Sequence, residues 1–133
     1  MYKRQIEECW KALTSANMSS YIRYLYKTVR KYFGEAVVVT QEVDDIISSP
    51  IVKESIINNA DCKILLDQRK YRNKFDQIQT LLGLTDKERA QVLSINLSND
   101  PARRYKEVFI SLGGVQSAVY ATEVSDEEYL VRP

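Results

Sequence analysis

Residues 36–41 read Ala-Val-Val-Val-Thr-Gln, and this stretch decides the fold class. Its first five residues form an apolar, β-branched run without polar alternation, which is typical of a parallel strand covered on both faces. Gln41 closes the run. The stretch therefore predicts a buried strand of an α/β sheet with a polar residue at its carboxyl end.

A helix is predicted directly before this strand. Apolar residues recur there at three- and four-residue steps, and Gly34 follows where a left-handed C-terminal cap is expected. The apolar positions are Ile22, Leu25, Tyr26, Val29, Tyr32 and Phe33. The opposite face is basic, because Arg23, Lys27, Arg30 and Lys31 fall within about 100° of one another on a helical wheel. Such a face is either solvated or a surface for DNA or a neighbouring subunit.

The segments after Gln41 continue the alternation of helices and strands. Two short helices are predicted within residues 42–59, on either side of Pro50. A second buried strand is predicted over residues 63–66, and a helix over residues 69–82 that ends at Gly83. A further helix begins at Thr85, which has capping-box spacing to a glutamate three residues later.

The pattern changes to a period of two after Pro101, which predicts antiparallel strands. Residues 108–112 and 117–122 flank the pair Gly113-Gly114 and form a predicted hairpin. Ser125 has capping-box spacing to Glu128, so a last helix begins there. The fold class predicted from this order is α/β, with a mainly parallel sheet, flanking helices and a C-terminal antiparallel hairpin.

Composition excludes several classes of function. The chain has 133 residues, with 19 Lys and Arg against 18 Asp and Glu, so any nucleic-acid surface must be a local patch. Histidine is absent, which excludes a Ser-His-Asp triad and every His-containing zinc site. The two cysteines, Cys9 and Cys62, match no metal-ligand spacing and are predicted to be reduced thiols.

Polar residues follow two of the predicted strands. Residues 6–10 resemble the terminus of a truncated strand, with Glu7 and Glu8 directly after that strand. Gln41 follows Thr40 at the end of the next strand. Ligands of α/β sheets bind at the carboxyl ends of strands. Adjacent carboxylates there suit a nucleotide-bound magnesium ion, and a glutamine beside them suits the attacking water or the γ-phosphate. The alternative is that these residues belong to ordinary solvated loops.

Several stretches occur in an order that resembles the C-terminal part of the TraG-type conjugative transfer ATPases, relatives of the hexameric motor ATPases of type IV secretion. The resemblance extends over about residues 6–131. Its stretches are residues 7–13 (EECWKAL), 26–31 (YKTVRK), 39–42 (VTQE), 56–68 (IINNADCKILLDQ) and 82–88 (LGLTDKE). The resemblance implies a RecA-like P-loop domain that uses ATP and Mg²⁺.

The resemblance also implies a role for each candidate site residue, according to the position of that residue in the family's motifs. Glu7 and Glu8 correspond to the Walker B acidic pair, with Glu7 on the magnesium side, acting through water, and Glu8 activating the attacking water. Glu7 replaces the aspartate that is usual in the wider superfamily. Gln41 corresponds to the glutamine that senses the γ-phosphate. Arg103 and Arg104 are the candidates for an arginine finger, and solvated helix-end arginines are the alternative.

The resemblance also implies partners and a location. Identical subunits in a hexamer, other type IV secretion proteins and, as a further candidate, DNA are the expected partners. The expected location is cytoplasmic and peripheral at the inner membrane. The runner-up function is a non-catalytic module that binds protein or DNA within the secretion machinery.

A phosphate-binding loop is absent from the sequence. None of the glycines is followed by lysine, so the motif G-x-x-x-x-G-K-[ST] does not occur in these residues. We expect residues 1–5 to be a non-native leader and residues 6–133 to be the C-terminal part of an ATPase domain, from Walker B onward. Walker A is expected upstream of residue 1, and the fragment alone is expected to be inactive.

Overall fold

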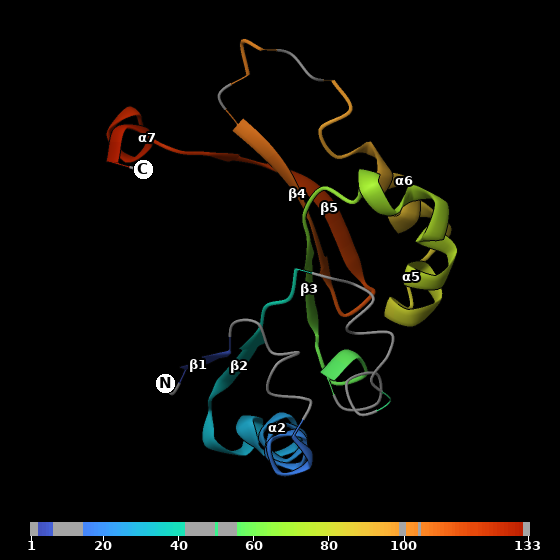
Figure 1. Cartoon of the computed structure of the whole chain (residues 1–133), viewed down its shortest axis with the longest axis vertical. Helices are drawn as coiled ribbons and strands as arrows, with labels where there is room; N and C mark the ends of the chain where they lie inside the picture. The colour runs from blue at the N-terminus through green and yellow to red at the C-terminus, as the bar shows by residue number, and fades with distance from the viewer. Residues whose placement is uncertain are drawn as a thin grey trace. The chain divides into compact units, whose positions relative to one another are not determined.

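The computed structural model describes residues 3–6, 15–41, 50, 56–98, 101–103 and 105–131. The chain divides into two compact units, Met1–Ala60 and Asp61–Pro133. Figure 1 shows their elements along the chain. Each unit is an assembly of helix and strand, which confirms the α/β class.

The first unit is built on two parallel strands joined through a helix. β1 (Lys3–Ile6) pairs with β2 (Glu35–Val38), in a register that places Ile6 opposite Val38. The connection contains α2 (Ala16–Thr28) and the 3₁₀ helix η1 (Val29–Tyr32). A helical crossover of this kind is what two parallel strands require.

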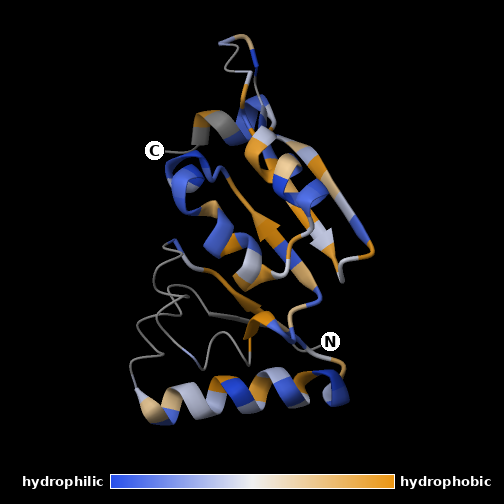
Figure 2. Ribbon diagram, turned by 90° about the vertical axis from the view of Figure 1, so that its right-hand side faces the viewer, coloured by the Kyte–Doolittle hydropathy of each residue, from blue (hydrophilic) through white to orange (hydrophobic). Residues whose placement is uncertain are grey.

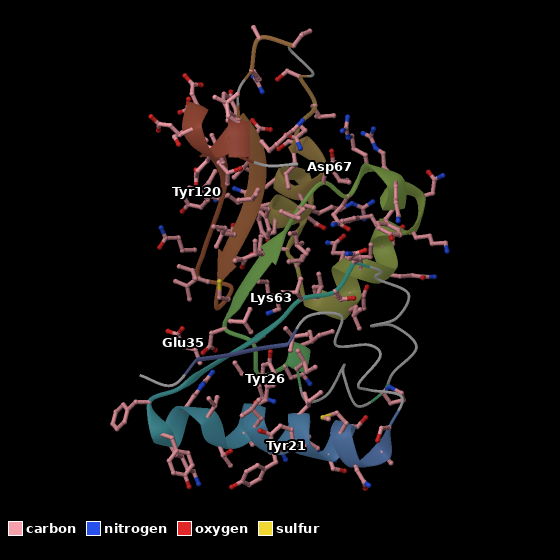
Figure 3. All side chains as sticks on the ribbon, turned by 60° about the vertical axis from the view of Figure 1, so that its left-hand side comes forward. Tyr21, Tyr26, Glu35, Lys63, Asp67 and Tyr120 are labelled. Atoms are coloured by element: carbon pink, nitrogen blue, oxygen red, sulfur yellow. The ribbon has the colours of Figure 1, made fainter. Side chains whose placement is uncertain are left out.

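One side of α2 packs into the first unit. Ser19, Ile22 and Tyr26 are buried, and they recur at three- and four-residue steps. The Tyr26 hydroxyl donates a 3.4 Å hydrogen bond to the carbonyl oxygen of Ala36 in β2. Figure 3 shows Tyr26 on the side of α2 that faces β2 and Tyr21 on the opposite side. The predicted helix is therefore confirmed, and its apolar stripe is confirmed at Ile22 and Tyr26. The stripe was wrong for Tyr32 and Phe33, which are 72% and 87% exposed, because the 3₁₀ turn that follows α2 changes the direction of their side chains.

The left-handed residue at the end of this helix is Phe33, and the prediction of Gly34 was wrong. Phe33 has φ 52°, whereas Gly34 donates its N–H to the carbonyl oxygen of Val29 at 3.0 Å. The 3₁₀ turn after Thr28 tightens the chain, so the reversal falls one residue earlier than an uninterrupted α-helix would place it.

The second unit is an antiparallel sheet with helices on one face. β3 (Cys62–Leu65), β4 (Tyr105–Leu112) and β5 (Gln116–Glu123) pair in the order β3-β4-β5. The helical elements are η3 (Arg69–Lys74), α5 (Phe75–Leu82), α6 (Asp86–Ser94) and α7 (Asp126–Val131). Figure 2 shows α5 and α6 lying over the sheet.

The core of the second unit forms between these helices and the sheet. Phe109 of β4 is fully buried, and Ser111, two residues along the strand, is buried on the same face. The helices contribute apolar side chains, and the turns that follow them add two more. These core residues are Phe75, Ile78, Leu84, Val92 and Ile95.

The hairpin and the helix boundaries of this unit are confirmed. Gly113 and Gly114 have φ of 57° and 71°, which allow the turn between β4 and β5. Gly83 caps α5 with φ 66°, and Thr85 forms the predicted capping box at the start of α6. Ser125 caps α7 by accepting the N–H of Glu128 at 3.2 Å. The predicted helix over residues 69–82 is 3₁₀ in its first six residues.

The prediction of a mainly parallel sheet was wrong for residues 63–66. β3 runs antiparallel to β4, and Ile64 is 60% exposed, so this strand is not covered on both faces. In the described residues, parallel pairing occurs only between β1 and β2, and Val37 of β2 is 46% exposed. An apolar run predicts a strand, but it does not determine the strand's direction or how many layers cover it.

The predicted helices within residues 42–59 lie largely outside the described residues. Ile56 and Ile57, the last apolar positions of that segment, are buried. The division of the chain into a leader (1–5) and an ATPase part (6–133) stays a prediction, and β1 begins at Lys3.

Glu88 accepts three hydrogen bonds, two from the cap of α6 and one from the sheet. Its carboxylate accepts the backbone N–H of Thr85 at 2.8 Å, the Thr85 hydroxyl at 3.2 Å and the Ser111 hydroxyl at 2.8 Å. Burial, the largest single influence, raises the pKa of Glu88. The hydrogen bonds from Thr85 and Ser111, with the charge of Lys63, outweigh it and leave the pKa below its usual value.

We therefore expect the second unit to lose stability in acid through Glu88. A carboxyl group with a lowered pKa in the folded state stabilises the fold above its unfolded pKa, about 4.3, and this contribution disappears as the pH falls through the folded pKa. Glu88→Gln should lower the free energy of unfolding by about 1–3 kcal/mol at pH 7. The difference from the unsubstituted chain should shrink at pH 3, as measured by urea denaturation. Glu123→Gln, at the exposed end of β5, is the matched control and should show neither effect.

Candidate nucleotide site

The carboxyl ends of β1 and β2 define one candidate edge. The strands are parallel and in register, with Ile6 opposite Val38, so both end at the same edge of the pair. Glu7 is the next residue in the sequence after β1, and Gln41 follows β2 by three residues. This is the edge at which ligands of α/β proteins bind.

Gln41 is the only one of the three predicted residues at this edge that the structure describes. It is exposed after β2, and its neighbour Thr40 is partly buried. A side-chain amide in this position has both a donor and an acceptor to present to a water molecule or a phosphate oxygen. Glu7 and Glu8 lie outside the described residues.

Arg103, the first arginine-finger candidate, lies in the second unit just before β4. Its Nη1 lies 3.5 Å from Oε1 of Glu107, and its guanidinium lies 5.1 Å from the centre of the Tyr105 ring. Both contacts leave the side chain on the surface. Arg104, the second candidate, lies outside the described residues.

A polar cluster connects β3, the end of α6 and β4, and the sequence reasoning did not find it. Asp67 accepts the backbone N–H of Arg69 at 3.0 Å and its Nε at 2.9 Å. Asn96, which has φ 55°, donates Nδ2 to Asp67 at 3.5 Å. Asn96 and Glu107 exchange two further bonds: the Asn96 N–H donates to Glu107 at 2.7 Å, and the Glu107 N–H donates to Asn96 Oδ1 at 3.0 Å.

Two carboxylates of this cluster, those of Asp67 and Glu107, are held in place by neighbouring side chains. The hydrogen bond from the Arg69 guanidinium is the largest influence on Asp67 and lowers its pKa, and burial opposes it more weakly. Glu107 accepts from Asn96 with Oε2 and faces Arg103 with Oε1. The sequence offered one signal, Asp67 two residues before Arg69, which is the spacing of an Asx turn. Figure 3 shows Asp67 at the end of β3.

The described residues offer neither a cluster of metal ligands nor a membrane-spanning helix. In the described part of the chain, no three Cys, Asp or Glu side chains are grouped so that they could hold a metal ion. No helix among these residues is long and apolar enough to cross a membrane. Cys62 is an exposed free thiol, and Cys9 lies outside the described residues.

Two parallel strands joined through a helix make the first unit a βαβ unit of the α/β class. The chain belongs to the TraG P-loop domain family, whose match extends over residues 3–132. Membership of this family confirms the resemblance drawn from the sequence stretches.

A solved structure shares this fold. The chain is similar to VirB4 of Thermoanaerobacter pseudethanolicus with a TM-score of 0.65 and 22% sequence identity. The match covers 96% of this chain and 32% of that chain, so the chain spans about a third of the length of the VirB4 protein. No curated protein matches the chain.

Proposed function

We propose that this chain is part of an ATP-hydrolysing motor of a conjugative, type IV secretion system, to which it contributes the Walker B acidic pair and the sensor glutamine. The observation that carries the proposal is the in-register parallel pairing of β1 and β2, which ends both strands at one edge. Membership of the TraG P-loop domain family supports it, and so does the likeness of the fold to VirB4.

The residues at this edge fit one half of a site for ATP and Mg²⁺. Carboxylate oxygens are the protein ligands that Mg²⁺ prefers, usually with waters between, and Glu7 offers them. The backbone amides and lysine of a phosphate-binding loop are the other half, and its motif does not occur in these 133 residues. Mg²⁺, when bound, neutralises charge on the β- and γ-phosphates.

The proposed chemistry is in-line attack of water on the γ-phosphate. Glu8 accepts a proton from the attacking water as general base, and Gln41 orients that water through its amide. Glu7 would hold Mg²⁺ through water. The bond between the γ-phosphorus and the oxygen that bridges to the β-phosphate breaks, the products are ADP and inorganic phosphate, and the proton leaves through Glu8.

Arg103 or Arg104 stabilises the developing charge in the site of a neighbouring subunit. The proposed assembly is therefore a ring of identical subunits, six by analogy with the motors of type IV secretion.

The first test is the DNA in frame upstream of codon 1. We expect it to encode G-x-x-x-x-G-K-[ST] between a strand and a helix, and we expect the protein made from that longer frame to hydrolyse ATP with Mg²⁺. The 133-residue chain alone should not bind ATP tightly, because it lacks the amides that cradle phosphate. A stop codon upstream with no such loop, or a longer protein without hydrolysis, would contradict the proposal and favour a non-catalytic binding module.

A further inference from the structure

We propose that the outer face of α2 and η1 binds single-stranded nucleic acid. This basic–aromatic surface consists of Arg23, Tyr24, Lys27, Lys31, Tyr32 and Phe33, all of which are exposed. The inference goes beyond the proposed ATPase function, and it does not depend on that function, because the surface is complete in this chain.

Two cations and a ring are neighbours on the exposed side of α2. Arg23 and Lys27 are four residues apart, and Tyr24 and Lys27 are three apart, so these side chains are neighbours on the helix surface. The face that packs into the first unit is the opposite one, with Ile22 and Tyr26 buried. Figure 3 shows the same division, with Tyr21 pointing away from the side that carries Tyr26.

The charge of this segment is all of one sign. Residues 15–34 contain four Lys and Arg and no Asp or Glu, whereas the whole chain carries a net charge of only +1. Within the described residues, Arg23, Lys27 and Lys31 make no ion pair. Arg30, between them, donates to the carbonyl oxygen of Asn59 at 3.4 Å. A run of cations without carboxylates is complementary to a phosphate backbone.

The exposed rings favour single strands over duplex. Tyr24, Tyr32 and Phe33 are 60%, 72% and 87% exposed. Phe33 also occupies the left-handed conformation, with φ 52°, which glycine adopts more readily than an aromatic residue. The fold gains little from this ring. Rings beside cations stack on unpaired bases, which a duplex hides.

An interfacial membrane helix would have a different pattern. Such a helix turns an apolar face toward the lipid and keeps its cations on the polar face. In α2 the apolar stripe is buried in the first unit, and the exposed side mixes cations with rings. The pattern therefore favours nucleic acid.

The test is fluorescence anisotropy of a labelled dT20 oligonucleotide titrated with the 133-residue chain, without ATP. We expect a Kd of about 1–100 µM at 50 mM NaCl, and affinity about 20-fold lower at 200 mM NaCl if three phosphates are contacted. A 20-base-pair duplex should bind more weakly than dT20, because its bases are stacked on one another.

Variants separate the roles of charge and stacking. The double substitution Lys27→Gln and Lys31→Gln should weaken binding. It should also lower the slope of log Kd against log salt concentration by about 1.4, because two phosphate contacts are lost. Phe33→Gly should weaken dT20 binding by about 5- to 150-fold with the salt slope unchanged, while the folded chain becomes no less stable to urea. The matched controls in the second unit are Lys87→Gln with Lys106→Gln, and Tyr120→Ala, which should leave binding unchanged.

Three results would overturn the proposal. The first is no binding of dT20 at 50 mM NaCl, and the second is binding that the α2 and η1 variants leave unchanged. The third is failure to bind dT20 together with binding to vesicles of phosphatidylglycerol, which would identify the surface as a membrane contact. A failure of ATP hydrolysis in the longer protein would not affect any of these measurements.

Discussion

Glu8→Gln should lower ATP turnover of the longer protein by about 10²- to 10⁴-fold while leaving nucleotide affinity nearly unchanged. Glutamine keeps the size of glutamate and its hydrogen-bonding oxygen, but it cannot accept a proton at neutral pH. A general base acts in the transition state, so its loss lowers kcat and leaves the binding of ATP intact. The measurement is steady-state phosphate release together with the Kd of a fluorescent ATP analogue.

The matched control is Glu123→Gln, an identical substitution at the exposed end of β5, which should leave both quantities unchanged. Glu7→Gln should raise the Mg²⁺ concentration needed for half-maximal rate, because Glu7 is assigned to the metal side. If Glu8→Gln left turnover within a factor of about two, the assignment of Glu8 as the base would fail, because a positioned base contributes far more.

Local signals in the sequence predicted most individual elements. The capping boxes at Thr85 and Ser125, the cap at Gly83 and the Gly113-Gly114 turn all depend on residues adjacent in the chain. Such interactions are short-ranged, so the same residues form them in any fold that admits the helix or hairpin.

Sheet organisation could not be predicted from the same signals. β3 was expected to be a buried parallel strand, but its partner is β4, some forty residues later, and it runs antiparallel. Strand direction depends on the path of the intervening chain, which includes η3, α5 and α6. The apolar run 36–40 was likewise expected to be covered on both faces, yet Val37 is half exposed.

Only those residues of the candidate site that follow a strand closely or belong to a motif could be predicted from the sequence. Glu7, Glu8 and Gln41 were found because each follows a strand closely, and the register of β1 and β2 supports their common edge. The cluster of Asp67, Asn96 and Glu107 joins three elements distant in the sequence. No periodicity connects such residues, so only the folded structure brings them together.

The cluster also affects how the arginine-finger candidates are to be tested. Arg103 faces Glu107, and Glu107 is held by Asn96 through both its backbone and its side chain. An arginine with this ion pair has two roles open to it: it can stabilise the fold of its own subunit, or it can act in the reaction of a neighbouring subunit. A loss of activity in Arg103→Ala therefore needs a readout that a structural role would not give.

Arg103→Ala or Arg104→Ala should lower turnover in the assembled ring by about 10³-fold if the residue is the finger, because it removes a positive charge from the transition state. The free energy of unfolding of the subunit should change little for a surface arginine, by about 0–1 kcal/mol. Arg72→Ala, an exposed arginine of η3, is the matched control and should leave turnover unchanged. If neither candidate lowers turnover, the finger lies elsewhere in the protein.

Mixed rings distinguish a finger supplied to a neighbour from an arginine that acts within its own subunit. Subunits with Glu8→Gln and subunits with the finger substitution are each inactive alone. In a random equal mixture, about a quarter of the interfaces join an intact Glu8 to an intact arginine from the next subunit, so about a quarter of the activity should return. An arginine that acts on its own subunit's site, or that only supports its own fold through Glu107, leaves every mixed site defective, and the mixture then stays inactive.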